Sequence, residues 1–266
     1  MLRVKGITWT TAGVFPSRRF VQVWWRHVMV WRKTAPASLA GSLGEPFLYL
    51  LGLGYGLGRF VGSIGDMDYM VYVASGILAA NSMNTATFEA IYGGFTRMTR
   101  QYTFHAMLAT PLTVADVVAG EIAWAATHSL ISGIAIFIVG LPLGAFSWKM
   151  VFVVLAIVAF SGLAFGAMAM VMTAISPSYD FFLYYFTLVT TPMFLFCGVF
   201  YPVDSLPVWI QTLVTLMPLT HVVALLRPVA NGLMPSDIGI HLAVIACYAT
   251  AGFMAAVALV RRRIIV

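Results

Sequence analysis

Charged residues are scarce in this chain. Asp, Glu, Lys and Arg make up 9% of its 266 residues, whereas ordinary soluble domains carry about 25%. Hydrophobic residues make up 61%, and apolar runs of about 20 residues, the length that crosses a hydrocarbon core as a helix, recur along the chain. No stretch resembles a soluble domain. The composition therefore excludes an ordinary soluble protein and predicts an all-α polytopic membrane protein.

Catalytic and metal-binding motifs are also missing. The three lysines, Lys5, Lys33 and Lys149, do not follow a glycine-rich loop, so the chain lacks a P-loop for ATP hydrolysis. It has no His-Glu-x-x-His segment, no Cys/His metal set and no serine-nucleophile elbow. Cys197 and Cys247 lie in apolar segments and are interpreted as small buried hydrophobic residues. We expect no enzyme and no bound cofactor or metal. The net charge of +6 belongs to the membrane flanks, so no nucleic-acid partner is expected.

Six apolar segments predict six membrane spans. They cover residues 38–58, 69–93, 116–140, 149–175, 181–202 and 237–260. Before the last span, residues 204–231 are apolar but are interrupted by Pro207, Pro218 and Pro228, which predicts a broken, re-entrant pair of short helices. With both termini in the cytoplasm, this count places 12 of the 15 basic residues inside and 3 outside, as the positive-inside rule requires.

Three parts follow from this count. Residues 1–37 form a cytoplasmic N-terminal segment, residues 38–260 one transmembrane domain, and residues 261–266 a cytoplasmic tail. Within the first part, residues 16–33 predict an amphipathic interface helix, with Arg19 and Arg26 on one stripe. Trp24 and Trp31 fall on another stripe. Such a helix either only anchors the topology or also braces a cytoplasmic partner, and the sequence leaves both open.

A polar, partly basic insert at residues 94–115 joins the second and third spans. The glutamates near the predicted cytoplasmic ends of the first three spans are Glu45, Glu89 and Glu121. Arg97 and Arg100 lie at a similar depth. One hypothesis is a carboxylate–arginine network that fixes the insert to the spans, and the alternative is that the charges snorkel to the interface. His128 shares a face with Glu121 and is either a hydrogen-bonded structural residue or part of a proton relay.

The residues in four segments carry a family resemblance. The segments are SLGEPFLYLLGLGYGLG (42–58), TFEAIYGGFTRM (87–98), TFHAMLATPLTVADVVAGEIAWAA (103–126) and GVFYPVDSLP (198–207). Together with the six-span layout, the basic insert and the broken segment, they resemble NodJ-type permeases. These permeases are membrane subunits of type-2 ABC exporters and export nodulation lipo-oligosaccharides.

The resemblance implies a homodimer of this chain paired with two copies of a separate ABC ATPase, which would bind ATP and Mg²⁺. It implies a coupling helix around residues 101–110 that docks into the ATPase. The coupling residues expected on this ground are Arg97, Arg100, Tyr102, Phe104, His105, Leu108 and Pro111. The substrate would be a lipo-oligosaccharide or lipid-linked glycan, moved outward across the bacterial inner membrane and in contact with membrane lipids on the way.

Other functions are open at this point. Exporters of the same class move drugs or polyketides, and the sequence does not choose between these substrates and a glycolipid. A secondary transporter is disfavoured because it needs an ion-binding carboxylate near the middle of the membrane, whereas the carboxylates here cluster at the predicted cytoplasmic ends. A membrane-embedded transferase is disfavoured because His128 and His221 stand isolated in sequence.

Overall fold

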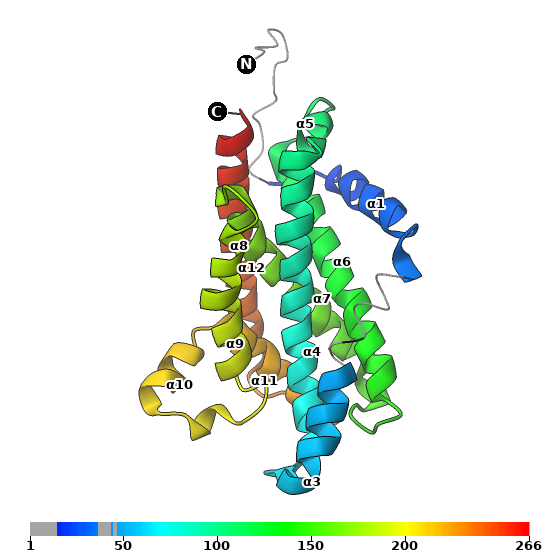
Figure 1. The fold of residues 1–266 in the computed structure, drawn as a ribbon, viewed down its shortest axis with the longest axis vertical. Helices are drawn as coiled ribbons and strands as arrows, with labels where there is room; N and C mark the ends of the chain where they lie inside the picture. Colours follow the sequence, from blue (N-terminus) through cyan, green and yellow to red (C-terminus); the bar gives the residue numbers. More distant parts are fainter. Residues whose placement is uncertain (1–14, 37–43, 45–46, 266) are drawn as a thin grey trace.

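The helices form an elongated bundle in which the longest helices run along the same direction (Figure 1). The computed structural model describes residues 15–36, 44 and 47–265. The four long helices are α4 (Tyr69–Phe88), α6 (Val114–Gly140), α7 (Val151–Ile175) and α12 (Ile238–Ile265). The shorter α-helices are α1 (Phe20–Trp31), α3 (Gly58–Val61), α5 (Thr103–Leu108), α8 (Phe181–Tyr185), α9 (Thr191–Phe196), α10 (Val208–Val214) and α11 (Pro218–Ala230).

Short π-helical and 3₁₀-helical segments adjoin several of these α-helices. The π-helical turns are η1 (Leu50–Leu57), η2 (Glu89–Gly93), η3 (Thr96–Arg100) and η5 (Phe186–Thr190). The 3₁₀ turns are η4 (Trp148–Met150) and η6 (Val203–Ser205). One feature departs from the all-α prediction. A two-stranded antiparallel hairpin of β1 (Ser63–Ile64) and β2 (Met67–Asp68) precedes α4, and Ser63 pairs with Asp68.

The six-span prediction is not confirmed by helix length and composition. Among the described residues, three helices are long and apolar enough to cross a membrane, or four if one bent pair is counted as a single span. They are Val114–Gly140, Trp148–Ile175 and Ile238–Ile265. The predicted first span lies partly outside the described residues, and its described helix, Phe47–Val61, is short. The predicted fifth span also forms a short helix, Phe181–Phe196, because the chain turns at Cys197 instead of continuing to residue 202.

Small and hydroxyl side chains hold the long helices close together. On α4, Ser82 donates to Ser161 of α7 at 2.9 Å, and Ser129 of α6 donates to Ser82 at 2.9 Å. Asn81 of α4 donates to Ser132 of α6 at 2.8 Å. Hydrogen bonds of this kind join helices inside a membrane, where lipid supplies no polar partner. The polar residues of α4 therefore face neighbouring helices, although they lower its hydropathy.

The predicted broken segment is bent. Helices α10 and α11 meet at 88° across a short break. Pro207 stands just before α10 and Pro218 is the first residue of α11, positions where a missing N–H costs nothing. Pro228 differs from the prediction, because it lies inside α11 and does not interrupt it. Cys197 is buried as expected, but Cys247 on α12 is exposed because it faces away from the bundle.

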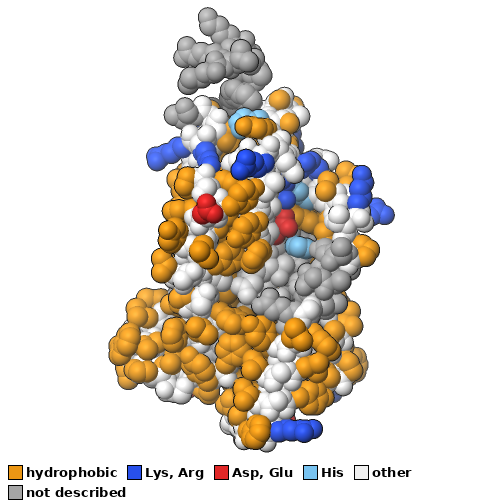
Figure 2. All heavy atoms as spheres, in the orientation of Figure 1, with side chains coloured by type: hydrophobic (Ala, Val, Ile, Leu, Met, Phe, Trp, Pro, Cys, Tyr) orange, Lys and Arg blue, Asp and Glu red, His pale blue; other side chains and the backbone are white. Residues whose placement is uncertain are grey.

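One end of the bundle collects the basic residues. Helix α5 and the C-terminal end of α12 lie at this end, and α3 and α10 lie at the other (Figure 1). Lys and Arg side chains visible in Figure 2 gather mainly at the α5 end, whereas the opposite half is largely apolar. Arg263 of α12 also caps α7 there, because its Nη1 donates to the carbonyl oxygens of Ala174 at 2.9 Å and Ser176 at 2.6 Å.

Candidate functional site

The insert at residues 94–115 folds into an elbow that packs against the bundle. Helix α4 continues through η2 and η3 as far as Arg100, and the chain then reverses at Tyr102, which has left-handed backbone angles with φ 53°. Helix α5 follows at once. Phe104 is fully buried and Leu108 is 5% exposed, so these two side chains anchor α5 against the bundle. One face of α5 therefore packs against the bundle through these side chains, and the opposite face is exposed.

The seven predicted coupling residues divide into three groups. Arg100, Tyr102, His105 and Pro111 are exposed at the end of the bundle, as docking would require. Phe104 and Leu108 are buried instead of exposed, because the short helix packs its apolar side against the bundle. Arg97 points into the bundle, where it pairs with Glu89 and Glu121.

Arg97 ties the insert to two spans. Its Nη2 donates to Glu121 of α6 at 2.6 Å, and its Nε donates to the same carboxylate at 3.0 Å. Its Nη1 donates to Glu89, at the end of α4, at 3.0 Å. Glu121 is fully buried. Arg97 therefore contacts both carboxylates, and its two-pronged contact with Glu121 fixes the guanidinium plane.

Two histidines complete the charge network, which consists of Arg97, Glu89, Glu121, His27 and His128. The Nε2 atom of His27, on α1, lies 3.0 Å from Glu121, and His27 is itself buried. The Nδ1 atom of His128 lies 3.4 Å from Glu89. Sequence reasoning missed His27, although its position three residues after Trp24 places it beside the aromatic stripe of α1.

The other two predicted charges are not part of the described network. Glu45 lies outside the described residues. Arg100 is exposed and lies over the ring of Tyr179 at 5.9 Å, so it neighbours the network without joining it. Position along η3 explains this difference, since Arg97 and Arg100 are three residues apart and only Arg97 faces α6.

Helix α1 packs on α6 through its aromatic stripe. Trp24 Nε1 donates to Thr127 Oγ1 at 2.8 Å, and Trp31 meets the ring of Trp124 at 6.2 Å. A Cβ at Gly120 would lie 2.5 Å from Val23 Cβ, so the absence of a side chain there allows the close approach. The predicted interface helix thus braces the bundle itself.

The residues just before α1 also hold the insert, from its other side. Arg19 Nη1 donates to the carbonyl oxygen of Pro111, and the backbone N–H of Ser17 donates to Asp116 at 2.6 Å. Asp116 forms a capping box with Thr113 at the start of α6. Arg26, on the predicted cationic stripe, is half-buried. The insert is therefore clamped by the charge network below it and by the beginning of α1 beside it.

The site consists of buried and half-buried charged groups that link the insert to α1, α4 and α6. Its polar groups pair with one another, and no group of three or more potential metal ligands occurs among the described residues. Buried charges are costly in a membrane and are kept only with partners, as they are here. A chain with membrane-crossing helices, a clamped polar elbow and a basic end belongs to the class of polytopic transport subunits.

Comparison with known proteins gives the family. The family model described as ABC-2 type transporter matches residues 18–230, so the chain belongs to the ABC-2 type transporter family. It is 43% identical over 249 residues to Nodulation protein J of Rhizobium leguminosarum bv. trifolii, covering 94% of this chain and 95% of that protein. It is 40% identical over 245 residues to Nodulation protein J of Rhizobium meliloti (strain 1021), covering 92% and 94%. No solved structure matches the chain significantly.

Proposed function

We propose that this chain is the membrane subunit of an ATP-driven exporter, and that it moves a nodulation lipo-oligosaccharide outward across the bacterial inner membrane. The relatives are named for nodulation and align over nearly the whole chain, which supports this substrate. The clamped insert is the observation that carries the mechanism. A folded elbow, fixed by buried charge to α4 and α6, is a suitable lever for force applied by another protein.

The partner would be an ABC ATPase, present in two copies on a homodimer of this chain, and ATP and Mg²⁺ would bind to that partner. Its docking surface on this chain would be the exposed face of α5 with Arg100, Tyr102 and His105. When the ATPases close, they would push on α5. Arg97 would carry the displacement to α4 through Glu89 and to α6 through Glu121. A rigid ion-paired lever moves the helices as units, which a flexible loop would not do.

The orientation follows from charge. The α5 end carries the basic residues of α1, η3 and the end of α12, and by the positive-inside rule this supports an orientation in which that end, and both termini, would be cytoplasmic. The bent pair α10–α11 would then lie at the extracytoplasmic side as a re-entrant element, since its backbone is broken where lipid alone could not satisfy it. An ATPase in the cytoplasm reaches α5 only in this orientation.

Replacing Ala106 with aspartate tests the docking surface. Ala106 is exposed on α5 between the buried anchors, so the change adds a charge to the face without disturbing the core. We expect loss of ATPase co-purification and of ATP-dependent uptake of an acylated oligosaccharide into inside-out vesicles. Ser236→Asp adds the same charge to an exposed loop before α12, at the end of the bundle opposite α5, and should retain both.

The controls separate the two parts of the proposal. Equal ATPase binding by Ala106→Asp and the unchanged protein would contradict the docking surface. Uptake of a polyketide drug in place of the acylated oligosaccharide would overturn the substrate and leave the ATPase partner intact. Uptake that follows a proton gradient without ATP would overturn the exporter class altogether.

A further inference from the structure

Two histidines face each other between α11 and the start of α12, at the end of the bundle where α10 lies (Figure 1). The Nδ1 atom of His221, on α11, lies 2.8 Å from the Nδ1 atom of His241, on α12. The Nε2 atom of His221 lies 2.9 Å from the carbonyl oxygen of Thr215, in the break between α10 and α11. His221 is buried and His241 is half-buried. The two rings therefore link the bent pair α10–α11 to the last long helix.

The geometry decides where the protons of the two rings lie. A carbonyl oxygen only accepts, so Nε2 of His221 carries a proton and donates it to Thr215. A neutral imidazole carries one proton, so Nδ1 of His221 is bare and accepts, and Nδ1 of His241 donates to it. The nitrogen left bare is Nε2 of His241, which has no hydrogen-bond partner among the described residues. Water can reach it because the side chain is half-buried.

This hydrogen bond tolerates one added proton and not two. The first proton binds at Nε2 of His241 and leaves the bond between the two Nδ1 atoms in place. The second can bind only at Nδ1 of His221, which would set two N–H groups against each other with their nitrogen atoms 2.8 Å apart. Both rings would then be cationic. Like charges at such a distance repel strongly, so the bond breaks.

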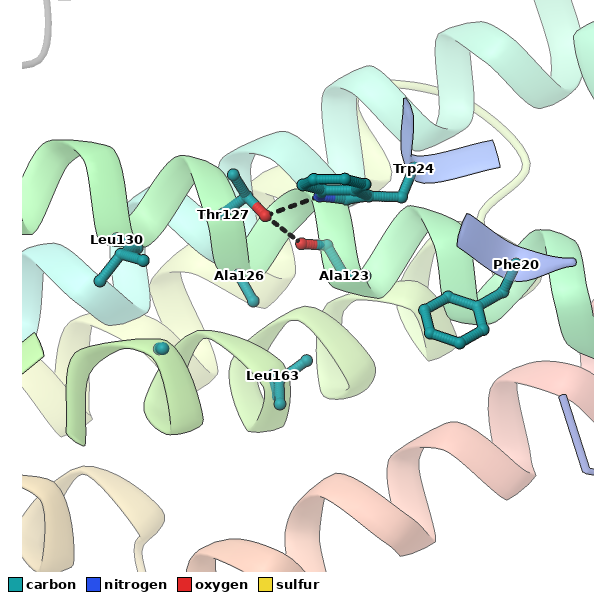
Figure 3. A pocket seen from close by; sticks show the side chains of 8 residues that line it. Phe20, Trp24, Ala123, Ala126, Thr127, Leu130 and Leu163 are labelled. Atoms are coloured by element: carbon teal, nitrogen blue, oxygen red, sulfur yellow. Dashed lines mark hydrogen bonds between the residues drawn. The ribbon is translucent and has the colours of Figure 1, made fainter. Parts of the chain in front are cut away.

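Other hydrogen bonds between the helices lack this property. Trp24 Nε1 donates to Thr127 Oγ1 at 2.8 Å beside the groove between α1 and α6, as Figure 3 shows. Neither of these groups gains or loses a proton near neutral pH, so their bond holds in acid and at neutrality alike. Histidine is the side chain whose charge ordinarily changes between about pH 5 and 8.

The groups around the pair keep their charge in this range. Helix α11 packs against α4, α7, α9 and α12. Helices α7 and α9 contain no titratable side chain, and α4 contributes only Tyr69 and Tyr72, which lose their protons near pH 10. Asp237, just before α12, acts on His241 with a negative charge that favours the first proton there. The other titratable groups on α11, on the first half of α12 and at the turn after α9 also keep their charge state: Arg227, Cys247, Tyr248 and Cys197.

We propose that His221 and His241 form a pH-sensitive latch between the bent pair α10–α11 and α12. The latch is closed when the two rings hold no added proton or one, and it opens when the second proton binds. Opening releases α11 from His241 and leaves Tyr248, which donates to the carbonyl oxygen of Leu216 at 2.8 Å, to hold the break against α12. In the orientation proposed above, acid outside the cell would loosen the extracytoplasmic end of the transporter. This inference does not depend on the identity of the exported substrate.

A distance measurement on the full chain tests the latch. Spin labels are placed on cysteines at Thr212 of α10 and Thr250 of α12, both exposed, in a protein whose Cys197 and Cys247 are replaced by serine. Detergent solution gives both ends the same pH, so the result does not depend on the proposed orientation. Electron–electron resonance should show one distance near neutral pH. A second, longer distance should grow in as the pH falls and become the larger population below about pH 5, where both rings are charged.

His241→Gln supplies the decisive comparison. An amide carries both a donor and an acceptor, so it can pair with Nδ1 of His221 whether that ring is neutral or charged. This variant should keep the shorter distance in acid. Tyr248→Phe is the matched control, because it removes another hydrogen bond between α12 and the break but no histidine, and its response to pH should remain. A distance independent of pH in the labelled protein with both histidines, or the same response to pH in His241→Gln, would overturn the latch.

Discussion

Glu121→Gln lowers the apparent melting temperature of the purified protein by about 10 °C. The variant leaves the guanidinium of Arg97 and the ring of His27 buried beside a neutral amide. Removing one partner of a buried ion pair costs about 3–5 kcal/mol, and each kcal/mol shifts the melting temperature of a chain of this size by about 2–4 °C. Thermal unfolding followed by intrinsic tryptophan fluorescence measures the change.

The controls come from the same charge network. Glu89→Gln makes the same chemical change at a carboxylate that is 16% exposed, so its effect should be smaller. The double variant Arg97→Gln/Glu121→Gln should be less destabilised than the two single losses summed, because residues in contact couple. A loss in Glu121→Gln no larger than in Glu89→Gln would contradict the role of the buried carboxylate.

Gly76→Ala destabilises the opposite end of the bundle by about 1–3 kcal/mol, the usual cost of overpacking. Gly76 lies in α4, where a Cβ would lie 2.8 Å from the Cα and 3.0 Å from the carbonyl carbon of Val199. Backbone atoms cannot rotate away as a side chain can, so α4 and the turn at Gly198 must separate. The same turn accepts the hydroxyl of Tyr72 at 3.3 Å, and that bond would be strained.

Gly52→Ala is the matched control for this substitution. Gly52 is helical and has nothing within 4 Å of an added Cβ, so alanine there should be neutral or slightly stabilising. Chemical denaturation in detergent, read by helix content, compares the two variants. Equal midpoints for Gly76→Ala and the unchanged protein would show that the close approach of α4 to Val199 is wrong.

The sequence predicted the class because composition and apolar length decide it. A low share of charged residues and repeated apolar runs predict a membrane protein. The basic insert between two apolar runs predicts a segment that lies outside the membrane. The sequence also offered the hypothesis that Glu45, Glu89 and Glu121 form a network with Arg97 and Arg100, since charges near one depth must find partners, but it did not say which charges pair. Family membership then followed from motifs spread along most of the chain.

Other features depended on tertiary contacts that no local pattern reveals. His27 joins the charge network because α1 packs on α6. This packing depends on the missing side chain at Gly120, and the sequence alone does not show that Val23 of α1 lies against it. Phe104 and Leu108 looked available for docking, because a short amphipathic helix does not show which face it buries. The fifth predicted span ends early because the chain turns at Cys197, within a run that is apolar throughout.

The central claim is that the insert faces the cytoplasm and receives force from a partner there. Its direct test places a single cysteine at Ala106, in a protein whose Cys197 and Cys247 are replaced by serine, and treats vesicles with a membrane-impermeant maleimide. The account predicts labelling of inside-out vesicles, no labelling of right-side-out vesicles, and protection when the ATPase is bound. Labelling of right-side-out vesicles alone would contradict it.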